Sequence, residues 1–442
     1  MTFSPQVLDA SSGPPGPARR RALLVAGIVL VGLVARVGAA AWLGLNKAPE
    51  PGSDQSEYDA YAWNLAQGNG YRGPSPDVAD PNHLTAYRPP LPSVLMAAIY
   101  AVAGHRYDAV RLVHCLLGAA SVWLTYRIGR RAYGEAVGLL AAAGYAVYPV
   151  AVLQSGDILS EPLGVFLFLL FLDVCLAFGR EGTWATAIGS GVVFGLALLT
   201  RANYVVMIPL FAVWAVVQFR GRPRMLLRAA AMLLIAGLVM TPWVVRNYRV
   251  FGEFIPFSTM GGSALLQGNN RLVVTQPPLY GYSVWDTQID EYREGLQSAG
   301  DELERDRRAK AFAVEWLKEN PDKWGFLLWQ KFIRSWTPYL KDNPSAAHRM
   351  MYLATWGPIL ALFGVALIPT LVRSLKTRDP TWLLHLAVLH YVLNSVVFFA
   401  NIRYRAPVDP ICIVLAAWTV AQVSRRIWRP ASDPRRGGTE TE

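Results

Sequence analysis

Charged residues are scarce in this sequence, and their scarcity excludes most classes of soluble protein. Asp, Glu, Lys and Arg make up 17% of the 442 residues, whereas soluble domains usually carry roughly 25%. Hydrophobic residues reach 53%, and apolar runs recur from residue 22 to residue 424. Several runs reach the roughly 20 residues needed to cross a bilayer core. Because lipid offers no partners for open backbone groups, such runs cross as helices. The composition therefore predicts an all-α polytopic membrane protein.

Cysteine is also scarce, and its placement excludes two kinds of site. The three cysteines, Cys115, Cys175 and Cys412, all lie inside apolar runs. They have neither the spacing of a zinc site nor that of a disulfide framework, so we interpret them as small packing residues. Arginines at residues 19–21 precede the first apolar run, and no small-residue cleavage site follows it. That run is therefore predicted to be an uncleaved transmembrane helix.

About ten segments are predicted to span the membrane. They lie at residues 22–45, 108–127, 134–153, 159–178, 184–200, 204–219, 226–245, 351–372, 381–400 and 406–424. A further apolar run at 89–104 has a helix-competent part too short for a normal span. If this run does not cross, most of the basic residues in short connections lie on the side of both termini, as the positive-inside rule requires. We therefore predict that 89–104 lies at the outer interface and that both termini are cytoplasmic.

The polar residues between spans are concentrated in two long segments, both predicted on the outer, non-cytoplasmic side. The first is 46–107 and the second is 246–350. Long loops of this kind are usually functional, so any chemistry is expected on the outer face. The second loop contains a predicted helical stretch at 301–337, rich in tryptophan towards its end. Two interpretations of it stay open: an anchor at the membrane interface, or packing against the transmembrane bundle.

The predicted organisation is thus one transmembrane domain between two short tails. The domain runs from residue 22 to residue 428, and the tails cover 1–21 and 429–442. Both tails are rich in Pro, Gly, Ser and Thr, which predicts disorder. The net charge of +11 reflects the cytoplasmic bias of basic residues and not a surface for nucleic acid, so no nucleic-acid partner is expected.

The first outer loop carries residues suited to chemistry at the lipid–water boundary. Asp54 comes shortly after the first span and precedes a predicted short helix, with Glu57 one turn later. Asp54 is either a helix cap or a carboxylate that acts as a general base. Arg88 stands before two prolines at the start of the interfacial helix. Pro favours helix starts, but a guanidinium at headgroup level also suits a phosphate.

A second acidic pair, Asp157 and Glu161, lies at the outer end of two spans. A spacing of four residues places both on one face of a helix. They could bind a divalent cation such as Mg²⁺ or Mn²⁺, position an acceptor, or pair with outer arginines. Those arginines run against the positive-inside bias, which indicates a separate reason for their presence. A lipid phosphate is one such reason, and phospholipid headgroups are the other. The arginines concerned are Arg201, Arg246, Arg403 and Arg405.

Several motifs together give the chain a resemblance to the GT-C glycosyltransferases. They include SDQSEYDAYAWNLAQGNGY, YRPPLP, YPVAVLQSGDILSEPL and IRYRAPVDP, and the resembling stretches extend over about residues 50–410. The chain resembles the branch that holds bacterial protein O-mannosyltransferases and the lipid A aminoarabinose transferase. This resemblance implies a GT-C-like bundle and an inverting enzyme of cell-envelope glycosylation in the plasma membrane. It implies transfer of a sugar from a polyprenyl-phosphate lipid to a glycan, lipid or protein acceptor.

The resemblance also implies roles for individual residues. Asp54 matches the first-loop acid that acts on or near the acceptor, and Arg88 matches the base that contacts the donor phosphate. Asp157 and Glu161 match the acidic motif that binds metal in related oligosaccharyltransferases. Arg403 or Arg405 matches the arginine of the late motif. Gln55 follows Asp54 where protein mannosyltransferases carry a second acid, which puts a protein acceptor in doubt.

Two other functions remain as alternatives. A polysaccharide polymerase or ligase that uses a lipid diphosphate donor would keep the outer loops and arginines without needing Asp54. A lipid or sugar transporter would show repeat symmetry and charges at mid-membrane. Only Arg36 fits that description, and no internal repeat is evident.

Overall fold

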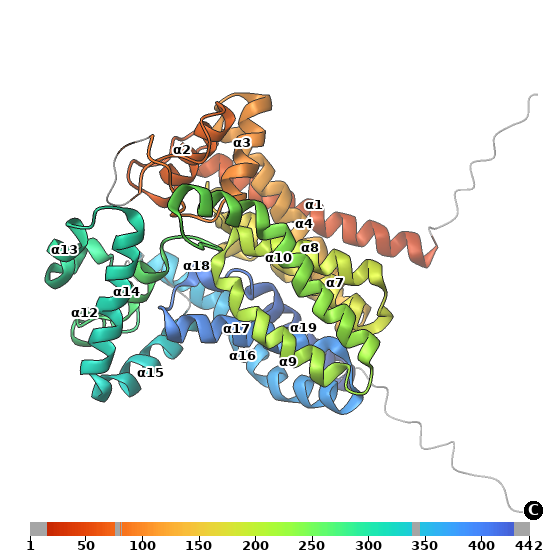
Figure 1. Ribbon diagram of the computed structural model, residues 1–442. Coiled ribbons are helices and arrows are strands. Elements are labelled where there is room, and N and C mark those ends of the chain that lie inside the picture. Colours follow the sequence, from red (N-terminus) through yellow and green to blue (C-terminus); the bar gives the residue numbers. More distant parts are fainter. Residues whose placement is uncertain (1–15, 76–79, 81, 338–344, 428–442) are drawn as a thin grey trace, which may run out of the picture.

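The regular secondary structure of the described residues is all helical, apart from one isolated bridge between Arg72 and Leu84. The computed structural model describes residues 16–75, 80, 82–337 and 345–427, and Figure 1 shows their arrangement. The first helix begins at Pro17, so the tail predicted for 1–21 overlaps it. The rest of that tail, up to residue 15, and the tail predicted at 429–442 lie outside the described residues.

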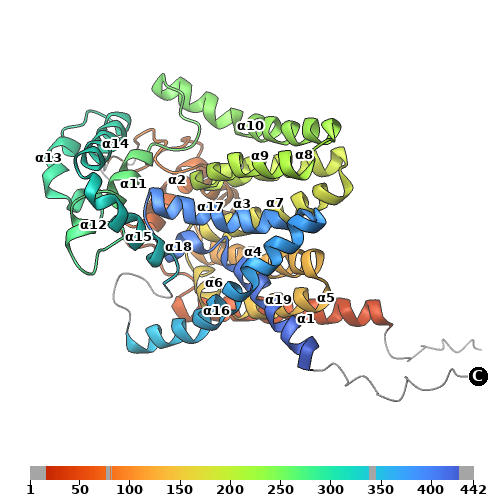
Figure 2. The ribbon, with the colours of Figure 1, turned by 90° about the horizontal axis from the view of Figure 1, so that it is seen from below.

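A bundle of side-by-side helices forms the larger part of the molecule (Figure 2). Its helices are α1 (Pro17–Leu43), α4 (Tyr107–Tyr133), α5 (Glu135–Ala146), α6 (Pro149–Gln154), α7 (Glu161–Glu181), α8 (Trp184–Thr200), η1 (Ala202–Val206), α9 (Met207–Gln218), α10 (Pro223–Phe251), α16 (Ala346–Thr377), η4 (Pro380–Trp382), α17 (Leu383–Val397) and α19 (Asp409–Ile427). Every predicted span coincides with one or two of these, which confirms the polytopic all-α fold. Six described helices are long and apolar enough to cross a membrane on their own: α1, α4, α7, α10, α16 and η4 with α17.

A second group of helices gathers at one end of the bundle, opposite the end at which α1 begins and α19 ends (Figure 2). We call these the loop end and the terminal end. The helices of the two long connections are α2 (Asp54–Ala66), α3 (Leu91–Ala103), α11 (Gly261–Gly268), α12 (Leu272–Thr275), η2 (Asp286–Gln288), α13 (Asp290–Gln297), α14 (Glu302–Glu319), η3 (Pro321–Lys323) and α15 (Trp324–Ser335), and α18 (Ile402–Arg405) follows α17. The helical stretch predicted at 301–337 is thus α14, η3 and α15. The second connection has a small core of its own around Leu266, Ile289 and Trp316.

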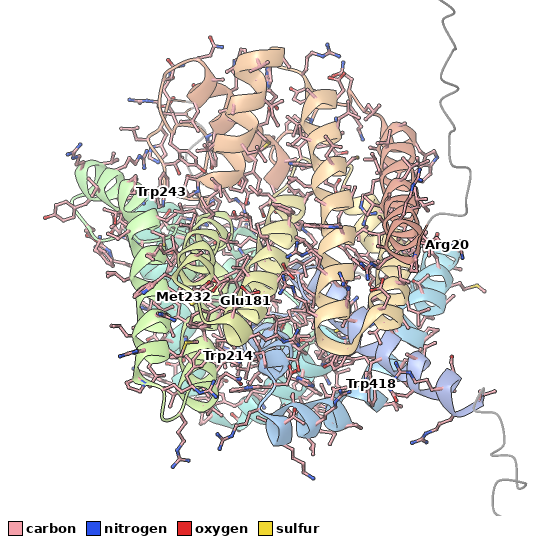
Figure 3. All side chains as sticks on the ribbon, turned by 90° about the vertical axis from the view of Figure 1, so that its right-hand side faces the viewer. Arg20, Glu181, Trp214, Met232, Trp243 and Trp418 are labelled. Atoms are coloured by element: carbon pink, nitrogen blue, oxygen red, sulfur yellow. The ribbon has the colours of Figure 1, made fainter. Side chains whose placement is uncertain are left out.

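The interfacial run predicted at 89–104 is the 13-residue helix α3, which packs against α2. At 1.5 Å per residue it is too short to cross a bilayer core. Across the bundle, Figure 3 shows Trp243 and Met232 of α10 on the side opposite Arg20 of α1. These two helices therefore form opposite flanks of the bundle.

The single span predicted at 134–153 is broken into α5 and α6. Pro149 begins α6, and a proline has no N–H to donate and disfavours helix in the residue before it. The break leaves carbonyl groups at the end of α5 without helical partners. Arg36 of α1 is buried there and donates to the carbonyl oxygens of Ala146 at 3.0 Å and Tyr145 at 3.4 Å. The intramembrane arginine noted in the sequence therefore has a structural role.

A buried ion pair joins α4 and α7 near the terminal end. Asp173 is 1% exposed, and its two oxygens lie 2.8 Å from Arg127 Nη2 and 2.9 Å from Arg131 Nε. Removing one partner of a buried pair leaves the other charges uncompensated. We predict that Asp173→Asn lowers the free energy of unfolding by about 3 kcal/mol.

The measurement is thermal unfolding in detergent, followed by a thiol-reactive dye that reaches the three buried cysteines only after unfolding. Asp379→Asn is the matched control, because Asp379 pairs with Arg180 at 3.4 Å with both side chains 36% exposed. Its unfolding temperature is expected to stay near that of the parent. Equal midpoints for the parent and Asp173→Asn would contradict the structural role of this pair.

Candidate active site

A cavity of about 290 Å³ lies at the loop end, between the bundle and the loop helices. One part of its wall is charged and comes from α2, the start of α3, the start of α7, and α18. The other part is apolar and includes Phe257, Val205 and the paired Phe398 and Phe399 at the end of α17. The cavity can therefore receive a molecule with a polar head and an apolar body.

Asp54 reaches this cavity because the residue before it caps α2. Ser53 is the N-cap, and its hydroxyl accepts a hydrogen bond from the Ser56 N–H at 3.3 Å. The sequence left two roles open for Asp54, helix cap or general base. In the structure, Ser53 and not Asp54 makes the capping hydrogen bond. The Asp54 carboxylate instead accepts from Arg88 Nη2 at 2.7 Å and from Arg403 Nη1 at 2.9 Å.

Carboxylates and guanidinium groups alternate along the charged wall. Arg88 also pairs with Glu57 of α2 at 2.7 Å, and Arg403 Nε lies 2.8 Å from Glu161 Oε1. Arg201 closes the series at 3.3 Å from the same oxygen. The order is Glu57, Arg88, Asp54, Arg403, Glu161 and Arg201. Three charges of each sign balance, which allows so many ionised groups to lie largely buried together.

The electrostatics of the site separate Asp54 and Glu57, the two carboxylates of α2 that contact Arg88. Burial opposes ionisation of Asp54, but Arg88 and Arg403 outweigh it and lower the pKa of Asp54 to about 2. For Glu57, burial prevails over the single partner Arg88 and raises its pKa. Asp54 is therefore ionised at neutral pH. While both arginines hold it, however, its basicity is too low for efficient proton abstraction.

Asp157 and Glu161 do not share a helix face, contrary to the prediction from their spacing. α7 begins at Glu161, with Pro162 in its first turn, and Asp157 lies in the turn before it. Proline favours the first helical positions, which explains the start. The backbone oxygen of Asp157 lies 2.8 Å from His114 Nδ1. Burial, followed by the nearby charge of Glu161, raises the pKa of the Asp157 carboxyl to about 6.

Two of the predicted phosphate-binding arginines are used elsewhere. Arg246 donates to the carbonyl oxygens of Thr85 at 2.8 Å and Tyr71 at 2.9 Å, and so joins α10 to the first loop. Arg405 is fully buried and pairs with Asp409 at 2.7 Å. Arg403 and Arg405 are two residues apart on a helix, so their side chains point to nearly opposite sides. Only Arg403 reaches the cavity.

The carboxylates of the cavity do not fit a divalent cation in this arrangement. Among the described residues, no three His, Cys, Asp or Glu side chains lie close enough together to hold a metal ion. Glu161 Oε2 is buried without a hydrogen-bond partner, but Mg²⁺ and Ca²⁺ take six or more oxygen ligands. Asp54 and Glu57, the other carboxylates of the charged wall, are paired with arginines, and Asp157 lies in the turn before α7. The Mg²⁺ or Mn²⁺ considered for Asp157 and Glu161 therefore has no built site here.

Some residues of the cavity were missed in the sequence. The Ser160 hydroxyl accepts from Arg201 at 3.1 Å, and the Tyr404 ring lies 5.1 Å from the Arg201 guanidinium. Tyr404 stands between the two arginines of a motif already quoted, so its position was a usable signal. The sulfur of Met260 lies 3.7 Å from Arg88 Nη1. Nothing in the sequence distinguishes Met260 from other loop residues.

The chain is similar in sequence to known proteins over part of its length. Residues 87–245 match the family model described as dolichyl-phosphate-mannose-protein mannosyltransferase. The undecaprenyl phosphate-alpha-4-amino-4-deoxy-L-arabinose arabinosyl transferase 1 of Pseudomonas fluorescens is 23% identical over 350 residues. That alignment covers 72% of this chain and 54% of the relative. The chain thus spans about half the length of this curated relative.

Solved structures share the fold. The archaeal oligosaccharyltransferase AglB from Archaeoglobus fulgidus, in complex with an inhibitory peptide and a dolichol-phosphate, superposes with a TM-score of 0.56 at 12% identity, over 93% of this chain and 51% of that one. Its apo form gives 0.55 at 15% identity, over 92% and 51%. At such identities the likeness concerns the fold alone. The predicted all-α membrane fold is thereby confirmed, and the chain shares the fold of these oligosaccharyltransferases.

Proposed function

We propose that this protein transfers a sugar from a polyprenyl-phosphate lipid to an acceptor at the outer face of the plasma membrane, with inversion at the sugar carbon. The observation that carries the proposal is the convergence of Arg88 and Arg403 on Asp54 in a cavity with an apolar wall. Guanidinium groups suit a phosphate, and the apolar wall suits the first units of a prenyl chain. The family match and the relative, whose names include dolichyl phosphate and undecaprenyl phosphate, support this donor class.

The proposed orientation follows from the charge at the two ends of the molecule. Short connections at the terminal end hold arginine clusters at residues 127–131 and 220–228, beside those next to both termini. The positive-inside rule favours the cytoplasm for this end. The loop end, with its cavity, then faces outward. A prenyl chain cannot leave the bilayer, so its sugar-phosphate is presented at the depth of the cavity.

Donor binding would change the state of Asp54. The donor phosphate competes with Asp54 for Arg88 and Arg403, and each arginine that turns to the phosphate removes a partner that lowers the pKa of Asp54. Burial, which already opposes its ionisation, then raises that pKa. Asp54 thereby becomes basic enough to accept a proton when the donor is in place. This coupling limits wasteful activation of water in the empty site.

The transfer is a single displacement. Asp54 accepts the proton of the acceptor hydroxyl while the acceptor oxygen attacks the sugar carbon from the side opposite the phosphate. The bond between that carbon and the phosphate oxygen breaks, and its electrons leave with the prenyl phosphate. Arg88, Arg201 and Arg403 stabilise the charge that develops on the leaving group, so no general acid is needed. Attack opposite the leaving group inverts the sugar carbon.

We predict that Asp54→Asn reduces transfer at least about 100-fold, because a general base contributes this much or more, while donor binding persists. The assay follows labelled sugar leaving prenyl phosphate in proteoliposomes supplied with a crude acceptor extract. The matched control is Asp59→Asn, which changes a carboxyl on the same helix that pairs with Tyr100 and His105. Equal rates for the parent and Asp54→Asn would remove Asp54 as the base. Release only from a lipid diphosphate donor would favour the polymerase or ligase alternative.

The pH profile tests the coupling between donor binding and Asp54. The base must be deprotonated, so rates fall as the pH drops below its pKa. For the free protein, reported by kcat/KM, that pKa is about 2, and no acid limb is expected between about pH 5 and 8. For the donor complex, reported by kcat, the limb is expected at higher pH. Arg403→Gln should bring an acid limb into the kcat/KM profile as well. Identical acid limbs in kcat and kcat/KM of the parent would contradict the coupling.

A further inference from the structure

Helix α15 has one buried face and one apolar exposed face. Leu327, Lys331 and Ser335 are buried at a spacing of four residues. Lys331 and Ser335 contact α17, whereas Leu327 belongs to the small core of the second connection. The remaining surface carries six large apolar side chains that are 39% to 59% exposed. They are Trp324, Phe326, Leu328, Trp329, Phe332 and Ile333. Packing against the rest of the protein, one of the two interpretations left open by the sequence, therefore accounts for the buried face of α15 but not for its exposed apolar face.

The contacts of α15 place its last turn below the outer end of the spans. The Ser335 carbonyl oxygen accepts from the Tyr391 hydroxyl at 2.9 Å, and Tyr391 lies six residues before α17 ends at Val397. Six helical residues correspond to roughly 9 Å, and helical side chains point back towards the helix N-terminus. The carbonyl oxygen of the next residue, Trp336, accepts from the Trp356 indole of α16 at 2.9 Å. The end of α15 thus lies at the depth of two membrane-spanning helices.

The neighbouring surface of α17 is also apolar and exposed. Leu389, Leu393 and Val397 follow one another at helical spacing and are 40%, 36% and 51% exposed. They belong to a segment long and apolar enough to cross the membrane, where such a surface would face lipid. α15 packs against this helix, as Figure 2 shows at the loop end. Its 12 residues are too few to cross a bilayer.

We propose that α15 lies in the outer leaflet, with its aromatic face against lipid acyl chains and headgroups. Tryptophan-rich amphipathic helices bind membranes in this manner. In this position α15 is also connected to elements that line the cavity. Lys331 Nζ donates to Asn269 Oδ1 at 2.8 Å and to the Val396 carbonyl at 3.2 Å. The lipid-bound helix is thereby joined to α11 and to the end of α17, next to Phe398 of the cavity wall.

The test is the environment of a fluorescent probe on this face, in the full-length protein in lipid nanodiscs. Trp329→Cys carries the probe, and Lys318→Cys on the exposed side of α14 is the control. The three native cysteines are buried and are not labelled in the folded protein. Lipids with quenchers on their acyl chains should quench the probe at residue 329 strongly and that at residue 318 little, with the reverse order for aqueous iodide. Equal iodide quenching at both positions would overturn the proposal. Protection of residue 329 from both quenchers would also overturn it, because protein would then cover this face.

A separate set of contacts points to Glu302, the first residue of α14. Glu302 is 5% exposed, and its carboxylate accepts from the Ala86 N–H and the Thr85 hydroxyl, both at 2.7 Å. The Thr259 hydroxyl donates at 3.2 Å. One buried carboxylate thus holds the first loop, the segment after α10 and α14 together. Charged hydrogen bonds of this kind are stronger than neutral ones.

These bonds fix the backbone immediately before Arg88. The Ala86 carbonyl accepts from the Thr259 N–H at 3.0 Å, so this residue is held through both its N–H and its carbonyl. Arg88 follows two residues later, and Pro89 and Pro90 restrict the chain beyond it. We infer that Glu302 is a positioning residue for Arg88, an inference that rests on the proposed function. Without Glu302, the phosphate-binding arginine would lose its fixed approach to the cavity.

The test compares Glu302→Ala and Glu302→Gln with Glu304→Ala, a more exposed carboxylate of the same helix turn that pairs with Arg308. Glu302→Ala should raise the donor KM about tenfold with a smaller change in kcat, as expected for lost charged hydrogen bonds. Glu302→Gln, which can still accept from Ala86, should recover much of the loss. Amide hydrogen exchange at residues 83–90 should accelerate in Glu302→Ala only. Unchanged exchange, or unchanged KM with faster exchange, would overturn the role. Absence of transfer by the parent would instead count against the proposed function.

Discussion

The contact on which the candidate site depends is the bridge made by Arg403. One guanidinium group lies between Asp54 and Glu161, residues that are 349 and 242 positions away from it in the chain. The bridge therefore joins the first long connection, the start of α7 and the connection between α17 and α19. Glu161 and Asp54 would repel each other across a largely buried cavity without it. In the proposed function, the same group would also bind the donor phosphate, so that assembly of the site and substrate binding would be alternative uses of one charge.

The transmembrane architecture could be read from the sequence because hydropathy and charge bias act along the chain. Each predicted span has a helical counterpart, and the run at 89–104 is a helix too short to cross. The break between α5 and α6 was not predicted, although Pro149 signals it, because the whole segment is apolar. The start of α7 was missed for a related reason: a spacing of four residues indicates a shared face only where both residues are helical, and Asp157 is not.

The direction in which each side chain points was the main feature of the site that the sequence could not predict. Asp54, Arg88, Glu161 and Arg403 were singled out by motif, and they do lie around one cavity. Arg246 and Arg405 also lie next to the ends of predicted spans. However, Arg246 donates to carbonyl groups of the first loop, and Arg405 pairs with a buried aspartate. Glu302 gave no signal because its partners are one backbone N–H, two hydroxyls and the His83 imidazole, 43 to 219 residues away. Such contacts arise from tertiary packing, and no spacing rule can reveal them.

In the proposed reaction, arginines would neutralise the leaving phosphate, a role that a metal ion has in other enzymes. The balance of charges in the wall explains why arginines would suffice. The charged wall is neutral, with three carboxylates and three guanidinium groups. A donor phosphodiester adds one negative charge, whereas the departing phosphate monoester carries up to two, since its second pKa is about 6. In the proposed transfer, the acceptor proton that passes to Asp54 would remove one negative charge from the wall at the moment the phosphate gains one. The wall and the bound phosphate together would therefore keep the same net charge before and after transfer, and the cost of burying an additional charge would be avoided.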